Sequence, residues 1–192
     1  MEMGKKELPE TTEILSRQMD KPLAADEAES DEQTPAVQGE LINGVEYAKN
    51  TVDTNAKTIV KFFQSVLGQY RLSHRPLDTI SDMNGVLKIE AMEKTQLRPS
   101  LSVTINGSSF PDWIIEVVSP DEEEMTYLMK TGIYAEVGVR EYWIVDPEKK
   151  VILDYDFGKH GFVPKIYDTP QRIKVGIYKD LFISFSDIFK AR

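Results

Sequence analysis

The stretch FPDWIIEVVSPDEEE, residues 110–124, contains an apolar strand, a charged residue inside that strand and the beginning of a helix. Residues 113–118 are large and apolar with the exception of Glu116, and they predict a buried strand. A carboxylate in an apolar strand is costly to bury unless another group pairs with it. Glu116 is therefore the first candidate functional residue, and the identity of its partner determines what the site can do.

A helix is predicted directly after this strand, over residues 119–139. Ser119 is a suitable N-cap, Pro120 fits the first helical position, and Glu122 completes a Ser-x-x-Glu capping box. The apolar residues that recur at helical spacing are Met125, Leu128, Met129, Ile133 and Val137. The predicted helix therefore has one face that can be buried.

The rest of the chain predicts further strands and one more helix. Asn43-Gly44 fits a type I′ turn in a hairpin over residues 40–47, and a helix follows with Asp53 or Thr54 as its cap. Strands are predicted at residues 85–92, 98–105, 141–146, 151–157, 161–167 and 172–178, and residues 181–189 close the chain. Strands, a crossing helix and more strands indicate an α/β fold in which helices flank a sheet.

The negative charge of the chain is concentrated at its amino terminus. The chain has 23 basic and 32 acidic residues, and residues 1–38 contain four of the basic and ten of the acidic ones. Residues 39–192 therefore contain 23 − 4 = 19 basic and 32 − 10 = 22 acidic residues, a net charge of −3. Residues 20–38 are acidic and contain few large apolar side chains, which is typical of disorder. We expect an acidic, mostly disordered tail over residues 1–38, able to bind a protein partner, and one folded domain over residues 39–192.

Two absences in the sequence narrow the class of protein. The chain has no cysteine, which excludes disulfides and thiolate metal sites. No apolar run has the length of a membrane span, and the basic pair near the amino terminus is not followed by an apolar segment. We therefore expect a cytoplasmic protein that does not associate with membranes.

The Pro-Asp pair in the quoted stretch resembles half of a metal site, but strand geometry argues against it. Asp112 and Glu116 are four residues apart on one face of the strand, a distance of roughly 13 Å at about 3.3 Å per residue. Two carboxylates that far apart cannot share one cation. A second ligand must come from a neighbouring strand, where facing positions lie about 5 Å apart.

The segments RPSLSV, FPDWIIEVVSP, YLMKTGIYAEVGVREYWIVDP and VILDYDF together resemble a widespread bacterial family described as "putative restriction endonucleases". This family belongs to the restriction-endonuclease-like superfamily, which is named for its PD-(D/E)XK motif. The resemblance covers residues 39–192 and is most specific from the Ser-Pro before the helix to the Asp-Pro after the next strand. It implies a restriction-endonuclease-like core with a mixed central β-sheet.

The resemblance also implies a reaction, metal-dependent cleavage of DNA. In the family, an Asp after Pro on one core strand and a Glu on the next bind a divalent cation, here Mg²⁺ or Mn²⁺, and a Lys adds positive charge near the phosphate. The Glu corresponds to Glu116. The motif position of the Lys holds Val118, so the resemblance assigns this role to Lys130. Thr126, Lys130 and Tyr134 are spaced by four, which predicts a helix stripe bordering the same cleft as Glu116.

The sequence departs from the family at several positions of the implied site. Ser100 replaces the Asp of the first core strand, and Thr126 replaces an Asp that commonly precedes the helical Lys by four residues. The His that often follows the hairpin is also missing. Glu40, in the hairpin, is the best candidate for a substitute metal ligand.

Two functions remain open on these residues. In one, the protein is a Mg²⁺- or Mn²⁺-dependent endonuclease that acts through Glu116, Lys130 and Glu40. In the other, it is a non-catalytic nuclease-fold protein that binds DNA or a protein partner, and Glu116 pairs with Lys130 alone. Tyr134 and Asp112 are expected to line the cleft, although Asp112 also suits a structural role at the start of the strand. The resemblance implies a homodimer.

Overall fold

The computed structural model describes residues 39–48, 54–74, 78–122 and 124–190. The chain divides into two units, residues 1–35 and 36–192, and everything below concerns the second. The predicted tail and the alternative cap Asp53 lie outside the described residues. Within the described residues, no helix is both long enough and apolar enough to cross a membrane.

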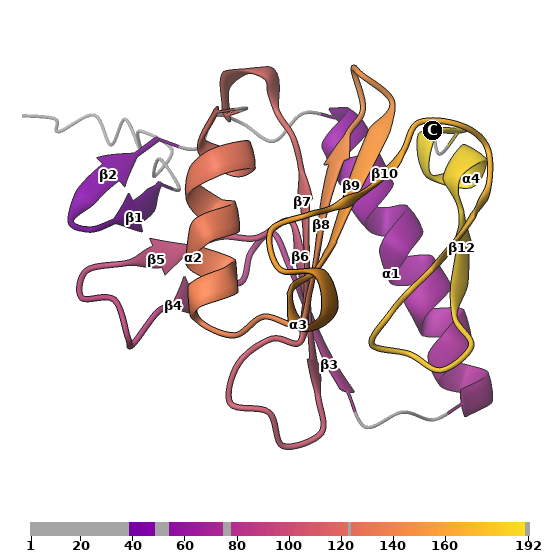
Figure 1. Ribbon diagram of the computed structural model, residues 1–192, viewed down its shortest axis with the longest axis horizontal. Helices are drawn as coiled ribbons and strands as arrows, with labels where there is room; N and C mark the ends of the chain where they lie inside the picture. Colours follow the sequence, from indigo (N-terminus) through magenta and orange to yellow (C-terminus); the bar gives the residue numbers. More distant parts are fainter. Residues whose placement is uncertain (1–38, 49–53, 75–77, 123, 191–192) are drawn as a thin grey trace, which may run out of the picture. The chain divides into compact units, whose positions relative to one another are not determined.

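A six-stranded sheet forms the centre of the fold (Figure 1), with the strand order β10-β9-β8-β7-β6-β3. The strands are β3 (Asp78–Asp82), β6 (Leu101–Ile105), β7 (Trp113–Val117), β8 (Glu141–Asp146), β9 (Val151–Asp156) and β10 (Lys165–Tyr167). Strands β7 and β8 are parallel because a helical crossover connects them, and all other neighbours are antiparallel. The predicted mixed central sheet is confirmed.

Smaller elements surround this sheet. The helical segments are α1 (Thr54–His74), η1 (Pro120–Glu122), η2 (Met125–Lys130), α2 (Thr131–Glu136), α3 (Phe157–His160) and α4 (Phe185–Lys190). A second sheet, ordered β2-β1-β5-β4, contains β1 (Glu40–Ile42), β2 (Val45–Tyr47), β4 (Leu87–Lys88) and β5 (Gln96–Leu97). Strands β11 (Arg172–Lys174) and β12 (Phe182–Ser184) form a third.

The alternating side chains of β7 are buried on both faces of the central sheet. Trp113 packs edge-on against Phe63 of α1 and Trp143 of β8, with ring centroids 6.2 and 5.1 Å apart. Ile114, on the opposite face, belongs to the cluster that contains the buried residues of η2 and α2. Because helices cover both faces, every residue of β7 is buried, including Glu116.

The hairpin and the strand–helix–strand order agree with the sequence prediction. Asn43 and Gly44 both have positive φ values, 51° and 83°, as a type I′ turn requires. The register of the hairpin pairs Glu40 with Tyr47. The hairpin therefore places Glu40 at the start of β1, on a strand that also pairs with β5.

The structure differs from the sequence prediction in several details. The single helix over residues 119–139 begins instead as a 3₁₀ turn, in which the Glu122 N–H donates to the Ser119 carbonyl at 2.9 Å, and continues as a π-helix before α2. Strand β3 was missed, because DTISD has little apolar content. Residues 181–189 contain the short strand β12 followed by helix α4.

Candidate active site

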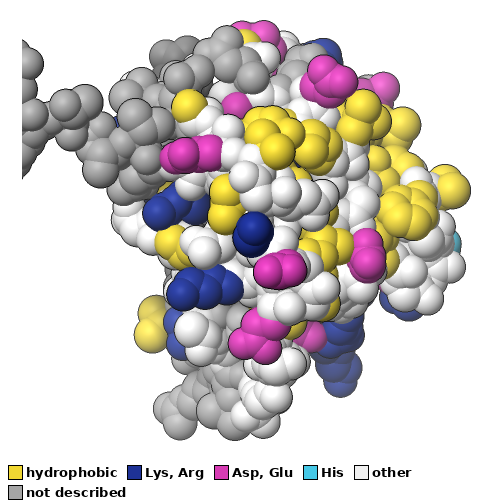
Figure 2. All heavy atoms as spheres, turned by 90° about the vertical axis from the view of Figure 1, so that its left-hand side faces the viewer, with side chains coloured by type: hydrophobic (Ala, Val, Ile, Leu, Met, Phe, Trp, Pro, Cys, Tyr) yellow, Lys and Arg dark blue, Asp and Glu magenta, His cyan; other side chains and the backbone are white. Residues whose placement is uncertain are grey.

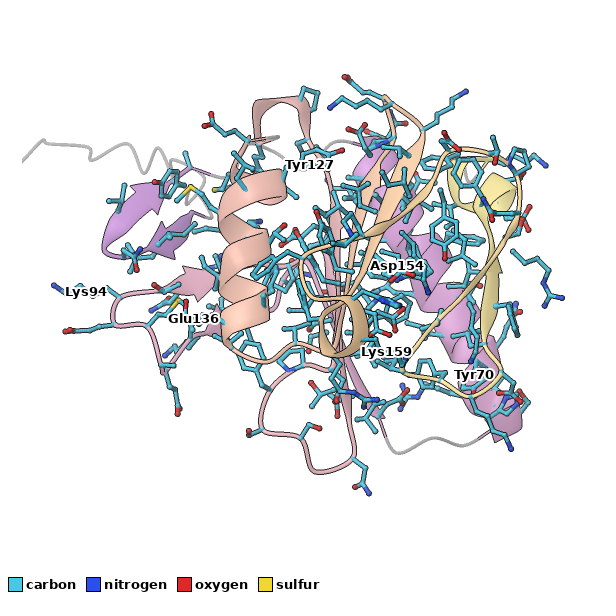
Figure 3. The ribbon with its side chains drawn as sticks, viewed as in Figure 1. Tyr70, Lys94, Tyr127, Glu136, Asp154 and Lys159 are labelled. Atoms are coloured by element: carbon cyan, nitrogen blue, oxygen red, sulfur yellow. The ribbon has the colours of Figure 1, made fainter. Side chains whose placement is uncertain are left out.

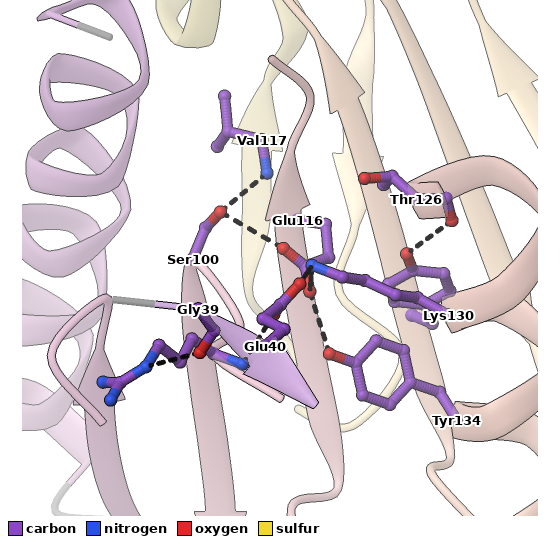
Figure 4. Close-up of polar contacts among 10 residues, drawn as sticks. Gly39, Glu40, Ser100, Glu116, Val117, Thr126, Lys130 and Tyr134 are labelled. Carbon is purple, nitrogen blue, oxygen red and sulfur yellow. Dashed lines mark hydrogen bonds and ion pairs between the residues drawn. The ribbon is translucent and has the colours of Figure 1, made fainter. Parts of the chain in front are cut away.

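Glu116 lies on β7, on the face of the sheet that η2 and α2 cover, and it is 2% exposed. Three side chains donate hydrogen bonds to its carboxylate (Figure 4). Oε1 accepts from Lys130 Nζ at 3.1 Å and from Tyr134 OH at 2.8 Å, and Oε2 accepts from Ser100 Oγ at 3.4 Å. These contacts compensate the burial of the carboxylate.

Glu40 approaches the same lysine from the hairpin. Its Oε2 lies 2.8 Å from Lys130 Nζ, and its Oε1 accepts from the backbone N–H of Arg98 at 2.6 Å. The Arg98 side chain also donates to the Gly39 carbonyl at 3.3 Å. Arg98 thus holds the hairpin beside the central sheet. This role was not predicted from the sequence, where the one signal for it is the position of Arg98 directly before the Pro99-Ser100 pair.

Lys130 is the last residue of the π-helix and is completely buried between the two carboxylates. Burial lowers the pKa of its ammonium group, but Glu116 and Glu40 outweigh burial and raise this pKa above its ordinary value. The pKa of the Tyr134 hydroxyl is also well above its ordinary value, chiefly through burial and then through Glu116. Lys130 is therefore charged, and Tyr134 is a neutral hydrogen-bond donor.

Ser100 lies immediately before β6, next to Glu116. Its Oγ donates to Glu116 and accepts from the backbone N–H of Val117 at 2.9 Å. The neighbouring pair Leu101–Ile115 belongs to the β6–β7 ladder. The position implied for the family's first Asp therefore lies beside the position of its Glu, as expected for adjacent strands.

Two of the predicted site residues lie outside this cluster. Asp112 Oδ2 accepts from the Ile105 N–H at 2.8 Å, and its Oδ1 pairs with Arg140 Nη1 at 3.3 Å. Asp112 thus joins the two ends of the β6–β7 turn and is not brought to Glu116. Thr126 is buried, and its backbone carbonyl accepts from Tyr142 OH at 3.3 Å. Among the described residues, the Thr126 side chain makes no hydrogen bond to the cluster.

The sequence matches the model of the Uma2 family, described as "Putative restriction endonuclease", over residues 26–163. The chain belongs to the Uma2 family. The matched range contains Glu40, Ser100, Glu116 and Lys130, so the cluster lies within the part of the chain that defines Uma2 membership. No curated protein matches the chain.

A solved structure supports the fold of this Uma2 domain. It is described as "Crystal structure of a putative nuclease belonging to DUF820 from Anabaena variabilis ATCC 29413", and it superposes with a TM-score of 0.66. The match has 19% sequence identity and covers 79% of this chain and 89% of the other. The restriction-endonuclease-like fold predicted from the sequence is confirmed.

The two carboxylates of the Uma2 cluster are of the ligand type that a hard divalent cation prefers, and a lysine lies between them. Glu40 Oε2 and Glu116 Oε1 both lie within 3.1 Å of one atom, Lys130 Nζ, so both are directed at one point. Mg²⁺ is typically held by one or two carboxylates and completes its coordination with water and substrate phosphate. Within the described ranges, no group of three or more Asp, Glu, His or Cys side chains is placed to hold a metal. The two carboxylates are thus the anionic ligands available here.

Proposed function

We propose that this Uma2 protein is a nuclease that hydrolyses phosphodiester bonds in DNA with Mg²⁺ or Mn²⁺ held by Glu40 and Glu116. The observation that supports this proposal is the convergence of the two carboxylates at 2.8 and 3.1 Å from Lys130 Nζ. These acids come from a hairpin and from a central strand. A purely structural need to neutralise Glu116 would be met by Lys130 alone.

Each residue of the cluster has a role in this reaction. Glu40 and Glu116 hold the cation, and Tyr134 fixes the orientation of the Glu116 carboxylate. In this proposal, a cation displaces the Lys130 ammonium group from between the two carboxylates, and Lys130 then offers positive charge to the phosphate that is attacked. A cation held by these two carboxylates would supply an activated water and would stabilise the charge that develops on the phosphate oxygens.

We further propose that cation binding is weak in this protein. Ser100 supplies a neutral hydroxyl where the family resemblance places an acid, and this hydroxyl already hydrogen-bonds to Glu116 and Val117. Lys130 already occupies the point between the two carboxylates, so a divalent cation must compete with an ammonium group for them. Both features reduce affinity for a hard cation.

The competition between Lys130 and a cation for Glu40 and Glu116 also supports a second candidate function. In this candidate the protein is non-catalytic and uses the nuclease fold to bind DNA. In that case Lys130 permanently takes the place of the cation, and the cluster links the hairpin to the central sheet. The two candidates differ in one measurable property, the binding of a divalent cation at Glu116.

Calorimetric titration of Mn²⁺ and Mg²⁺ into the full chain separates the two candidates. Wild type, Glu116→Gln and Ser100→Asp should be compared, with Asp112→Asn as a control that removes a nearby acid outside the cluster. We expect weak wild-type binding that Glu116→Gln abolishes and Ser100→Asp strengthens about tenfold or more, because Ser100→Asp adds an anionic ligand. Cleavage of supercoiled plasmid DNA by the same samples should follow the same order.

Each other outcome has a defined meaning. Binding that appears only in Ser100→Asp indicates that the wild-type site has lost its cation, and it favours the non-catalytic candidate. Wild-type binding that survives Glu116→Gln, or an absence of binding in every variant, overturns the proposed metal site.

A further inference from the structure

One edge of the central sheet, at β10, is not paired with another strand. Strand β10 is the last strand on its side of the sheet and pairs with β9 alone. Among the described residues, the backbone of residues 165–167 makes no backbone–backbone hydrogen bond beyond those of the β9–β10 ladder. An unpaired edge presents N–H and C=O groups that readily add another strand. The β10 edge is therefore a candidate interaction surface.

Large apolar side chains are exposed at this edge. Phe162, Val163 and Ile166 are 64%, 71% and 62% exposed. Ile166 lies in register with Leu153 of β9, and Phe162 packs edge-on against Phe157, with ring centroids 5.9 Å apart. Leu153 and Phe157 in turn pack against the hydrophobic cluster beneath η2 and α2. The exposed side chains thus continue the core of the protein out to its surface.

The surface of the molecule shows the same apolar region. Figure 2 presents the side that carries the hairpin and α2, where charged side chains are spread over the centre and left and hydrophobic side chains gather at the upper right. The right of this view is the part of Figure 1 that faces the viewer, where α3 lies. Exposed apolar side chains beside an unpaired strand are typical of a surface that another chain covers.

The opposite edge of the sheet, at β3, is protected by charge. This strand has an Asp at each end, and Ile80 is its one large apolar residue. Asp78 contacts both Tyr178 and Arg71. Charged residues on an edge strand hinder the addition of another strand. Copies joined head to tail, from β10 to β3, are therefore disfavoured, and such a contact would also be free to extend without closing.

A second copy of β10 fits the β10 edge through a two-fold axis. When identical strands pair antiparallel about such an axis, the residue at the axis faces its own copy. With Ile166 at the axis, two isoleucines face each other and Lys165 faces Tyr167 of the second copy. With Lys165 at the axis two lysines would face each other, and with Tyr167 at the axis Ile166 would face Asp168; like charges directly opposite are destabilising. Residues 161–169 contain one basic and one acidic residue, so their net charge does not repel a second copy.

The charge of Lys165 is used within its own chain. An edge lysine commonly prevents strand addition, but Lys165 lies in register with Asp154 of β9, which is labelled in Figure 3. Burial raises the pKa of Asp154, and the positive charge of Lys165 acts against burial. Because side chains alternate along a strand, Lys165 and Ile166 point to opposite faces. The face that carries Ile166 therefore keeps its apolar character.

We propose that two copies of this chain pair antiparallel through β10, about a two-fold axis at Ile166, and thereby cover Phe162, Val163 and Ile166. The pairing joins the two central sheets into one continuous sheet and uses both β10 edges. It goes beyond the proposed nuclease function and does not require a cation. A standard interface buries about 800 Å² per partner, and a strand of three residues supplies less, so the dimer should dissociate in the micromolar range.

The first test is the oligomeric state of the full chain, measured by sedimentation velocity from about 1 to about 100 µM. Ile166→Lys should be compared with Leu72→Lys, which changes an aliphatic residue on α1 that is 82% exposed. We expect wild type and Leu72→Lys to dimerise, and Ile166→Lys to raise the dissociation constant about tenfold or more, because two lysines then face each other. An equal mixture of Ile166→Lys and Ile166→Glu should restore the dimer, because opposite charges then meet at the axis.

The second test uses the absence of cysteine from the chain. Ile166→Cys introduces one thiol per copy, and facing positions of antiparallel strands have Cα atoms about 4.5–5.5 Å apart, within the range of a disulfide. We expect oxidation to link Ile166→Cys into a covalent dimer on non-reducing gels. Leu72→Cys is the control and should remain monomeric on the gel.

Three results would overturn the proposal. A wild type that is monomeric at about 100 µM leaves the β10 edge to a strand from a different protein. A dimer that persists in Ile166→Lys forms through another surface. A dimer that Ile166→Lys abolishes and the mixture with Ile166→Glu does not restore lacks the two-fold axis at Ile166. Because Ile166 is exposed, the Tm of its variants at about 1 µM should match that of wild type, which excludes misfolding as the cause.

Discussion

At the scale of single residues, the stability of the cluster depends on Lys130. This fully buried ammonium faces two carboxylates that are 1% and 2% exposed, Glu40 and Glu116. Its removal leaves two buried negative charges close together, and loss of one partner from a buried ion pair typically costs about 3–5 kcal/mol. Lys130→Met should therefore lower the free energy of unfolding by about this amount in urea denaturation.

The same variant also tests the competition between Lys130 and a cation. Without the ammonium group, the two carboxylates are available to Mn²⁺, so Mn²⁺ should raise the Tm of Lys130→Met more than that of wild type. Lys179→Met, at an exposed position, is the matched control and should behave as wild type. If Mn²⁺ raises both Tm values equally, the carboxylates do not bind the cation.

Tyr134 offers a second test at this scale. Its hydroxyl donates to Glu116 Oε1 at 2.8 Å, and Tyr134→Phe removes that donor from a buried charge. We expect the free energy of unfolding to fall by about 1.5–3 kcal/mol, the typical value of a hydrogen bond to a charged group.

Tyr142→Phe is the matched control for Tyr134. Tyr142 is equally buried and its ring contacts that of Tyr134, but its hydroxyl donates at 3.3 Å to a neutral carbonyl, that of Thr126. Its loss should cost about 1 kcal/mol. Urea denaturation of both variants checks the order, and equal losses would mean that the Glu116 charge adds nothing to the Tyr134 bond.

At the scale of elements, Glu141 links β8 to the C-terminal segment, and we expect this attachment to depend on pH. Its carboxylate accepts from Trp143 Nε1 and from the Ile177 N–H, both at 2.8 Å. Burial is the main cause that raises the pKa of Glu141 to about 7 and that of the nearby Asp154 to about 6. An acid whose pKa is higher in the folded state than in the unfolded state stabilises the fold more when it is protonated than when it is ionised.

The sign of the pH effect follows directly. The stability contribution of protonated Glu141 is complete below about pH 4.5 and is lost as the pH rises through about 7. The change corresponds to about 3 kcal/mol at 1.36 kcal/mol per pKa unit. Glu141→Gln should remove this part of the decline in stability between pH 5 and pH 8, measured by urea denaturation. Parallel pH profiles for variant and wild type would show that Glu141 does not titrate in this range.

At the scale of the whole molecule, short sequence patterns predicted helices and strands better than they predicted which strands pair with one another. Strand β7 and the helical segment after it follow from patterns within short segments, namely the apolar run at residues 113–118 and the helical spacing of the apolar residues after Ser119. Strand β3 was missed because Ile80 is the one large apolar side chain in DTISD, and pairing with β6 makes it a strand. The acidic tail, its protein partner and the homodimer remain predictions.

The sequence by itself determined that Glu116 is a carboxylate in a buried strand, and strand geometry alone excluded Asp112 as its metal partner. The roles of Lys130 and Glu40 came from the family resemblance. Only the tertiary structure decided that Ser100, Lys130 and Tyr134 contact Glu116, that Glu40 is linked to it through Lys130, and that Asp112 lies apart. The physical reason is that burial and strand formation depend on residues near each other in the chain. The meeting of a hairpin, two strands and a helix depends on long-range pairing and packing.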